Sequence, residues 1–351
     1  MRSHTALIRL EQLFDNSPRL LITPKDKIVI FSDLHLGNGG SNDDYSSNSA
    51  LFETILKEHY LPKGYKLILN GDVEELYKFS YKKIKIAWNS LFNLFEEFHK
   101  KNALIKITGN HDHDSVLGKY IEGTIPTLQS FVLEFENNSL FIYHGHQTAN
   151  IFEQFSWFVL FFIRFLFRNV SNDHLSIYSD KKFKTEALAY RFAALKKIIS
   201  ILGHTHRPLF ESMSKIDSLK MTIESIIRKY LKETTKNKTK LENQIRQYKI
   251  ELERLYSKNK EYNLRDGLYH ELILLPCLFN SGSVVGKHGI TGIEISNGNI
   301  KLIYWFDKNR SSRYLNYKGV SLKRFKETDF YKAILKKDSL DYIFSKIKLM
   351  S

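Results

Sequence analysis

The stretch KIVIFSDLH, which runs from Lys27 to His35, indicates the fold class of this chain. Its apolar residues Ile28–Phe31 predict a short β-strand that ends in a polar cluster. Asp33 and His35 follow at once, so we expect a carboxylate and an imidazole at the carboxyl end of the strand. In layered α/β folds, ligands and reacting groups gather at that end of the strands.

The same arrangement, a short strand that ends in residues able to bind a metal or move a proton, returns four times. The later strands and clusters are Lys66–Asn70 with Asn70-Gly71-Asp72-Val73-Glu74-Glu75, Ala103–Thr108 with Gly109-Asn110-His111-Asp112, Leu140–His144 with His144-Gly145-His146, and Ile198–Leu202 with Gly203-His204-Thr205-His206. Helical stretches at Asn48–His59 and Lys83–Lys100 separate the early strands, which indicates an α/β layered fold. Each cluster alone is a weak signal, but five in this order are hard to obtain by accident.

Composition favours a large folded body. The 351 residues are 42% hydrophobic and 13% aromatic, which excludes a disordered chain, and 17 Gly and 6 Pro are too few for a collagen-like or linker-like one. A single cysteine, Cys277, excludes an intramolecular disulfide framework and is compatible with a reducing compartment. Glu11 and Asp15 interrupt the apolar N-terminal residues, so we expect no signal peptide and a cytoplasmic location, with the membrane surface as an alternative.

The net charge of +15 is unevenly distributed. Residues 211–263 hold 13 basic and 8 acidic groups, and residues 301–351 hold 13 basic and 5 acidic groups, which leaves only +2 for the rest. An anionic partner would therefore meet these two appendages. The tail from about Arg310 mixes apolar and basic residues and favours a solvated helical layer.

Residues 211–263 also carry a heptad pattern on both sides of the polar stretch Glu233–Lys240. The apolar positions are Ile216, Leu219, Ile223, Ile226 and Tyr230, then Leu241, Ile245, Tyr248, Leu252 and Leu255. Two such arms predict an antiparallel helical hairpin. It is either a solvated structural arm or an arm for self-association or partner docking.

The most hydrophobic stretch is Phe155–Phe167, FSWFVLFFIRFLF. Its length of about 13 residues is shorter than the roughly 20 that cross a bilayer, and Arg164 interrupts it, so we expect no transmembrane helix. Two interpretations stay open. It is a buried helix, or it is a surface element that contacts lipid, with Trp157, Arg164 and Arg168 as interfacial anchors.

In content and order, the five clusters resemble the motifs of the calcineurin-like metallophosphoesterase superfamily: Asp-x-His, Gly-Asp-x-x-Asp/Glu, Gly-Asn-His-Asp/Glu, a separate His and Gly-His-x-His. The match covers residues 27–306, where Asn280-Ser281-Gly282-Ser283 is similar to the closing turn of the family. The resemblance implies a two-sheet β-sandwich flanked by helices. Residues 149–197 would then be an apolar helical cap. The resemblance does not cover residues 211–263, which the heptad pattern predicts as an inserted hairpin, or residues 307–351, which we expect to be a basic C-terminal extension.

For the site, the resemblance implies a dinuclear metal centre. One metal ion would be held by Asp33, His35, Asp72 and His206, and the other by Asp72, Asn110, His144 and His204, with Asp72 as the bridge. Two divalent cations about 3.5–4 Å apart can neutralise a phosphate ester and lower the pKa of a bound water. Oxygen and imidazole ligands without cysteine suit Mn²⁺, which we expect, with Fe and Zn²⁺ as alternatives.

His111 holds no metal in this scheme, so it could contact the phosphoryl oxygen or protonate the leaving group. The family pattern points to Glu75 as the carboxylate that orients it, with Asp112 and Glu74 as sequence-adjacent alternatives. His146 either supports a ligand or is structural.

Substrate contacts are expected from the loop that follows His35, where Asn38 and Asp43 are the candidates. Arg207, just after the last metal ligand, is a candidate for a substrate phosphate, or else a surface arginine before Pro208.

Chemistry is better specified than substrate. In layout the chain is most similar to the UDP-2,3-diacylglucosamine hydrolases, which insert an apolar helical cap where Phe155–Phe167 lies, although those enzymes usually carry Arg in place of His111. The expected reaction is hydrolysis of a phosphodiester, pyrophosphate or phosphomonoester bond on a lipid-linked or nucleotide-sugar substrate. The alternative is a nuclease or nucleotide phosphodiesterase that binds nucleic acid through the basic appendages. A catalytically silent scaffold is disfavoured, because no metal ligand is missing.

Overall fold

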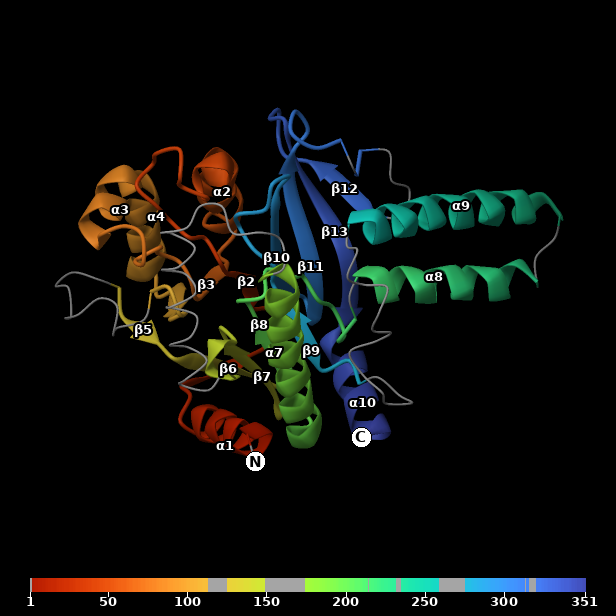
Figure 1. Ribbon diagram of the computed structural model, residues 1–351, viewed down its shortest axis with the longest axis horizontal. Helices are drawn as coiled ribbons and strands as arrows, with labels where there is room; N and C mark the ends of the chain where they lie inside the picture. The colour runs from red at the N-terminus through yellow and green to blue at the C-terminus, as the bar shows by residue number, and fades with distance from the viewer. Residues whose placement is uncertain are drawn as a thin grey trace.

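Two mixed β-sheets with helices on their outer faces form the body of the protein (Figure 1). The computed structural model describes residues 2–112, 125–148, 174–213, 215–231, 235–258, 275–312, 314–315 and 320–351. The expected α/β class with two sheets packed against helices is confirmed. The predicted apolar stretch 155–167, and residues 149–173 of the predicted cap, lie outside the described residues.

The larger sheet has eight strands, of which β2, β3, β4 and β5 are mutually parallel. Its strand order is β12 (Ser321–Arg324), β13 (Phe330–Ser339), β11 (Asn299–Asp307), β10 (Ile290–Ser296), β2 (Lys27–Phe31), β3 (Lys66–Asn70), β4 (Leu104–Ile107) and β5 (Thr127–Leu128). The parallel register brings the carboxyl ends of β2, β3 and β4 to one edge, where three of the predicted clusters begin.

The smaller sheet has five strands, and three of them are parallel neighbours. Its order is β1 (Arg19–Ile22), β6 (Ser130–Phe135), β7 (Asn138–Tyr143), β8 (Ile199–Leu202) and β9 (Leu278–Asn280). The carboxyl ends of β7 and β8 lead directly into His144 and into Gly203-His204. The last two histidine clusters therefore start from this second sheet.

The central strands are buried on both faces, which explains their unbroken apolar sequences. Ile30 and Ile68 pack into a core shared with the smaller sheet, whereas Phe31 and Leu69 pack into a second core on the opposite face. This division follows the alternation of side chains along a strand. The first core also receives α1 (Arg2–Asp15), α7 (His174–Lys196) and α10 (Leu340–Met350). The second is covered by α2 (Ser49–Ile55), the π-helix η2 (Leu56–Tyr60), α3 (Tyr81–Ala87) and α4 (Asn89–Lys100).

One predicted helix is in fact two. The stretch Lys83–Lys100 is divided between α3 and α4, with the break at Trp88. The indole N–H of Trp88 donates to the backbone oxygen of Gly37 at 3.1 Å and to Asp43 Oδ2 at 2.9 Å. The break thus serves a contact with the loop beside the site, which no local pattern could reveal.

The expectation of a solvated helical layer in the tail is wrong for most of its length. β13 pairs with β11 from Asn299 to Asp307, and β12 pairs with β13, so the tail extends the larger sheet. Tyr331, Ala333 and Leu335 alternate toward Phe306, which gives this segment the two-residue period of a strand. Only α10 at its end is helical.

Two long helices, α8 (Lys215–Tyr230) and α9 (Thr235–Lys258), lie side by side and project from the body (Figure 1). Most of the polar stretch Glu233–Lys240, which was expected to form the turn, lies in the first turns of α9. No helix in the described ranges combines the length and apolar character needed to cross a membrane.

Candidate metal centre

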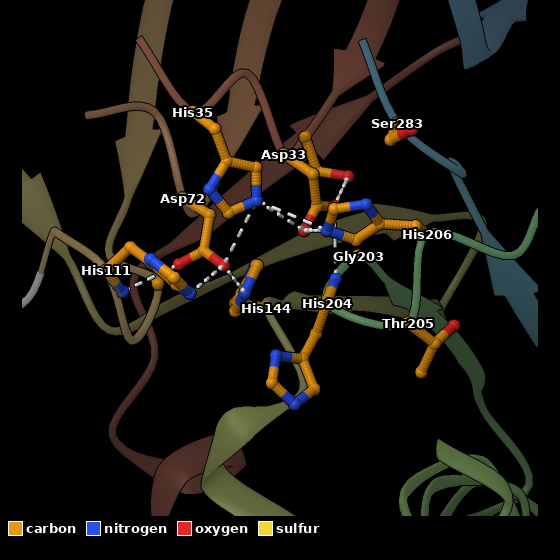
Figure 2. Close-up of polar contacts among 12 residues, drawn as sticks. Asp33, His35, Asp72, His111, His144, Gly203, His204, Thr205, His206 and Ser283 are labelled. Carbon is orange, nitrogen blue, oxygen red and sulfur yellow. Dashed lines mark hydrogen bonds and ion pairs between the residues drawn. The ribbon is translucent and has the colours of Figure 1, made fainter. Parts of the chain in front are cut away.

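The predicted ligands meet at the junction of the two sheets. Asp33 and His35 follow β2, Asp72 follows β3, and the loop after β4 brings Asn110 and His111. His144 follows β7, and His204 and His206 follow β8. Figure 2 shows the carboxylates of Asp33 and Asp72 between imidazoles that come from both sheets. The geometry thus brings all seven predicted metal ligands into one region.

The backbone at this junction has an unusual conformation. Five predicted ligands have left-handed dihedrals, with φ of 55° at Asp33, 47° at His35, 54° at Asp72, 62° at His204 and 55° at His206. Non-glycine residues rarely adopt this region, and such residues cluster at functional sites. The loops hold each other in place, because the backbone oxygen of Asp72 accepts the N–H groups of Leu34 and His35 at 2.9 and 3.0 Å.

Asp33, His35 and His206 form a first group whose ligand atoms all lie within 4.8 Å of one another. Asp33 Oδ1 is 3.1 Å from His206 Nε2, which is itself 3.2 Å from His35 Nε2. The other oxygen of Asp33 accepts from the hydroxyl of Ser32 at 2.5 Å and from the backbone N–H of His204 at 3.1 Å. Burial would raise the pKa of Asp33, but the charge and hydrogen bond of His206 lower it to about 2.

Asp72, His144 and His204 form a second group of the same kind. His144 Nδ1 lies 2.8 Å from the backbone oxygen of Asn70, which can only accept, so this nitrogen carries the proton. In the neutral ring, the lone pair of Nε2 then faces Asp72 Oδ2 at 3.1 Å. Burial would lower the pKa of His144, but the charge of Asp72 outweighs it and raises this pKa to about 10. The pKa of His204 is lowered to about 3 by burial and by the charge of His144.

Glu75 connects two imidazoles. Its Oε1 lies 2.8 Å from His111 Nδ1 and its Oε2 lies 3.0 Å from His35 Nδ1. A carboxylate that accepts both Nδ1 protons fixes both tautomers and leaves both Nε2 atoms for other contacts. His111 Nε2 is then 4.0 Å from Asp72 Oδ2. The pairing of Glu75 with His111 was expected, and its second contact with His35 was missed.

Glycines make this close approach feasible. Gly71 has φ of 82°, and a Cβ built on it would lie 2.4 Å from His144 Nδ1. A Cβ on Gly109 would lie 2.0 Å from Asp72 Oδ1. Both distances are far below van der Waals contact, so the glycines of these motifs leave room for the ligand side chains.

The donor atoms fit divalent metal ions. Asn110 Oδ1 is buried and makes no hydrogen bond, and the Nε2 of His144 faces a carboxylate although its ring proton lies on Nδ1. Two acceptors in such contact need a proton or a cation between them. Oxygen and imidazole donors without thiolate suit Mn²⁺, Fe or Zn²⁺. The two groups therefore match a dinuclear site, with Asp72 close to members of both.

The alternatives to Glu75 have other partners. Glu74 is buried and accepts from Lys106 Nζ at 2.5 Å. Asp112 accepts from the backbone N–H groups of Val73 at 2.6 Å and Gly109 at 2.5 Å, and burial raises its pKa to about 6. Both side chains thus organise the loops around the site.

The predicted substrate-contacting residues are also engaged within the protein. Asp43 accepts from the backbone N–H of Gly39 at 2.7 Å and of Tyr45 at 3.0 Å, and the oxygen of Asn38 accepts from Gly40. These bonds order the loop after His35. A role for Asn38 and Asp43 in substrate binding stays a prediction.

Arg207 forms an ion pair with Glu186 of α7, which is fully buried. Glu186 also accepts from the hydroxyl of Thr205 at 2.8 Å, so it holds the loop that carries His204 and His206. Sequence reasoning missed Glu186, because a single glutamate in a helix carries no local signal. The ring of His146 is buried 5.6 Å from that of His144.

A family profile described as calcineurin-like phosphoesterase matches residues 26–217, which is more than half of the chain. The chain belongs to this family and, with its buried histidine and aspartate clusters, is a metallophosphoesterase. A solved structure of a conserved uncharacterized protein from Streptococcus pneumoniae TIGR4, described as a predicted phosphoesterase, is similar at 13% identity, covering 91% of this chain and 99% of that one with a TM-score of 0.31. No curated protein matches the sequence.

Proposed function

We propose that the chain hydrolyses a phosphodiester or pyrophosphate bond at two divalent metal ions, with Mn²⁺ as the expected metal. Asp33, His35, Asp72 and His206 would hold one ion, and Asp72, Asn110, His144 and His204 the other. When bound, the ions would supply charge neutralisation of the phosphate and activation of water. The observation that carries this proposal is the convergence of the two ligand groups on Asp72, whose Oδ2 lies 3.1 Å from His144 Nε2 and 3.8 Å from His35 Nε2.

In this proposal His111 donates a proton to the phosphoryl or leaving-group oxygen. Its Nδ1 is held by Glu75 at 2.8 Å, so a protonated ring presents its Nε2 N–H toward the region around Asp72. Burial disfavours the charged ring, but Asp72 and Glu75 outweigh it and raise the pKa of His111. A positioned imidazole of this kind contributes about 10²–10⁴-fold to a reaction.

The substrate class within this reaction is a lipid-linked or nucleotide-sugar phosphate. The support is the apolar sequence of residues 155–167, which would contact the lipid part, and the layout shared with the UDP-2,3-diacylglucosamine hydrolases. Asn38 and Asp43 would contact the substrate from the loop after His35. Arg207, which follows His206 in the sequence, would contact a phosphate of the substrate.

Hydrolysis assays with bis-p-nitrophenyl phosphate and p-nitrophenyl phosphate in Mn²⁺ test the reaction. We expect faster hydrolysis of the diester, and a loss of about a hundredfold in kcat for His111→Gln on an alkyl phosphodiester, whose leaving group needs a proton, with the metal content retained. His99→Gln, an exposed histidine on α4, is the matched control. Wild-type rates of His111→Gln on the alkyl phosphodiester would contradict the role of His111, and exclusive hydrolysis of the monoester would contradict the substrate class.

A further inference from the structure

A basic pocket lies at the end of the larger sheet opposite the metal centre. Its volume is about 330 Å³, and five of its ten lining residues are lysines: Lys25, Lys27, Lys63, Lys66 and Lys101. Lys27 is the first residue of β2 and Lys66 the first residue of β3, whereas Asp33 and Asp72 follow the other ends of these strands. The pocket is unexpected from composition, because the body of the chain is nearly neutral.

Acidic side chains offset only part of the positive charge of this pocket, because Asp26 is its one acidic lining residue and Glu294 acts on Lys63. Within the described ranges, none of the five ammonium groups forms an ion pair with a carboxylate. The side chains of Lys27 and Lys66 instead donate to the backbone oxygens of Lys63 at 3.1 Å and Asn102 at 3.4 Å. The one acidic lining residue, Asp26, accepts from the backbone and hydroxyl of Thr23.

The surroundings add to this charge. Burial and the charges of Lys323 and Lys27 lower the pKa of Lys63, although the charge of Glu294 opposes them, so both lysines are close enough to repel Lys63. Lys323 belongs to β12, which means that the fold brings the basic tail toward the basic part of the body. Lys63 Nζ lies 3.1 Å from His59 Nδ1, and burial lowers the pKa of His59 to about 3, so the imidazole stays neutral.

We propose that this pocket binds a compact multivalent phosphate, such as a di- or triphosphate group. Five lysines whose charge the nearby acidic groups offset only in part favour an anion that carries several negative oxygens. The volume falls in the range of small-ligand pockets, about 300–1,000 Å³. A concave site of this size suits a compact group better than an extended nucleic-acid backbone.

The pocket is a second site, separate from the metal centre. Strands of five residues with a rise of about 3.3 Å per residue span about 16 Å between their two ends. A phosphate in the pocket therefore cannot reach the ligands around Asp72. Its binding does not depend on the proposed hydrolysis.

Calorimetric titration of the full-length, metal-loaded protein with sodium tripolyphosphate tests this inference. We expect Lys27→Gln/Lys66→Gln to weaken binding about tenfold or more, because two charge-assisted contacts are lost. A second pair, Lys25→Gln/Lys101→Gln, should weaken it similarly. Lys82→Gln/Lys83→Gln, two exposed lysines of α3 that line no part of the pocket, should leave it unchanged.

The Asp72→Asn variant tests whether tripolyphosphate binds in this pocket or at the metal centre. Binding that survives Asp72→Asn and is lost in the lysine variants supports the inference. Binding that is lost only in Asp72→Asn, or no binding to the wild type, would overturn it. Flotation with vesicles of phosphatidylcholine, with and without phosphatidylinositol bisphosphate, distinguishes a lipid headgroup from a free polyphosphate as the ligand. Flotation that is lost in the lysine variants indicates a lipid headgroup. Binding of tripolyphosphate without flotation indicates a free polyphosphate. A DNA duplex that competes better than tripolyphosphate would contradict the compact ligand.

Discussion

Replacing Glu75 by glutamine should slow the reaction by a factor that depends on the leaving group of the substrate. The carboxylate accepts from His111 at 2.8 Å and from His35 at 3.0 Å. A glutamine can accept from only one ring, and its amide N–H groups would oppose the other Nδ1 proton. A hydrogen bond to a charged group contributes about 1.5–3 kcal/mol. Since about 1.4 kcal/mol corresponds to a tenfold change in rate, we expect kcat to fall by about 10–150-fold.

The leaving group distinguishes a proton-transfer defect from a general one. A nitrophenolate departs without a proton, whereas an alkoxide needs one, so the loss should be larger for an alkyl phosphodiester than for bis-p-nitrophenyl phosphate. The assay compares kcat for both substrates, with metal content measured on the same samples. Glu74→Gln is the matched control, because Glu74 is equally buried but pairs with Lys106. Equal losses for both substrates would refute the reasoning.

Three further predictions concern stability and, in one case, metal content. Gly71→Ala should cost more than about 3 kcal/mol and lower the metal content, because its Cβ would overlap the ring of His144; thermal unfolding and metal analysis check this. Arg207→Met leaves the buried charge of Glu186 unpaired and should cost about 3–5 kcal/mol in chemical denaturation, much of which Glu186→Gln should restore. The lowered pKa of His59 means that the unfolded chain binds the extra proton between about pH 6.5 and 3, so stability falls as pH falls through that window. His59→Gln should reduce the fall between pH 6.5 and pH 4 by about 2 kcal/mol, which is less than the roughly 3 kcal/mol that the full shift would give, because solvent screens this partly exposed ring.

The positions of the chemical groups could be predicted from the sequence because they follow directly from strand ends. Lys66–Asn70 has the bounds expected for it, and Asp72 and Glu75 follow within five residues. Parallel strands then bring such clusters to one edge, so spacing along the chain translates into proximity. The pairing of Glu75 with His111 was expected from the family resemblance, since the residues alone left Asp112 and Glu74 as alternatives.

Features that depend on contacts between distant segments could not be predicted. Glu186 reaches Thr205 and Arg207 only because α7 packs beside β8, and β13 becomes a strand because β11 offers it a hydrogen-bonding edge. The left-handed backbone at Asp33 and His206 is imposed by neighbouring loops and has no signal in residue type.

Metal analysis of the purified protein together with its Asp72→Asn variant tests the central claim most directly. We predict two divalent ions per wild-type chain, at most one in the variant, and a loss of more than about a hundredfold in the hydrolysis of bis-p-nitrophenyl phosphate. A variant that keeps both ions and wild-type activity would contradict the assignment of Asp72 as the shared ligand.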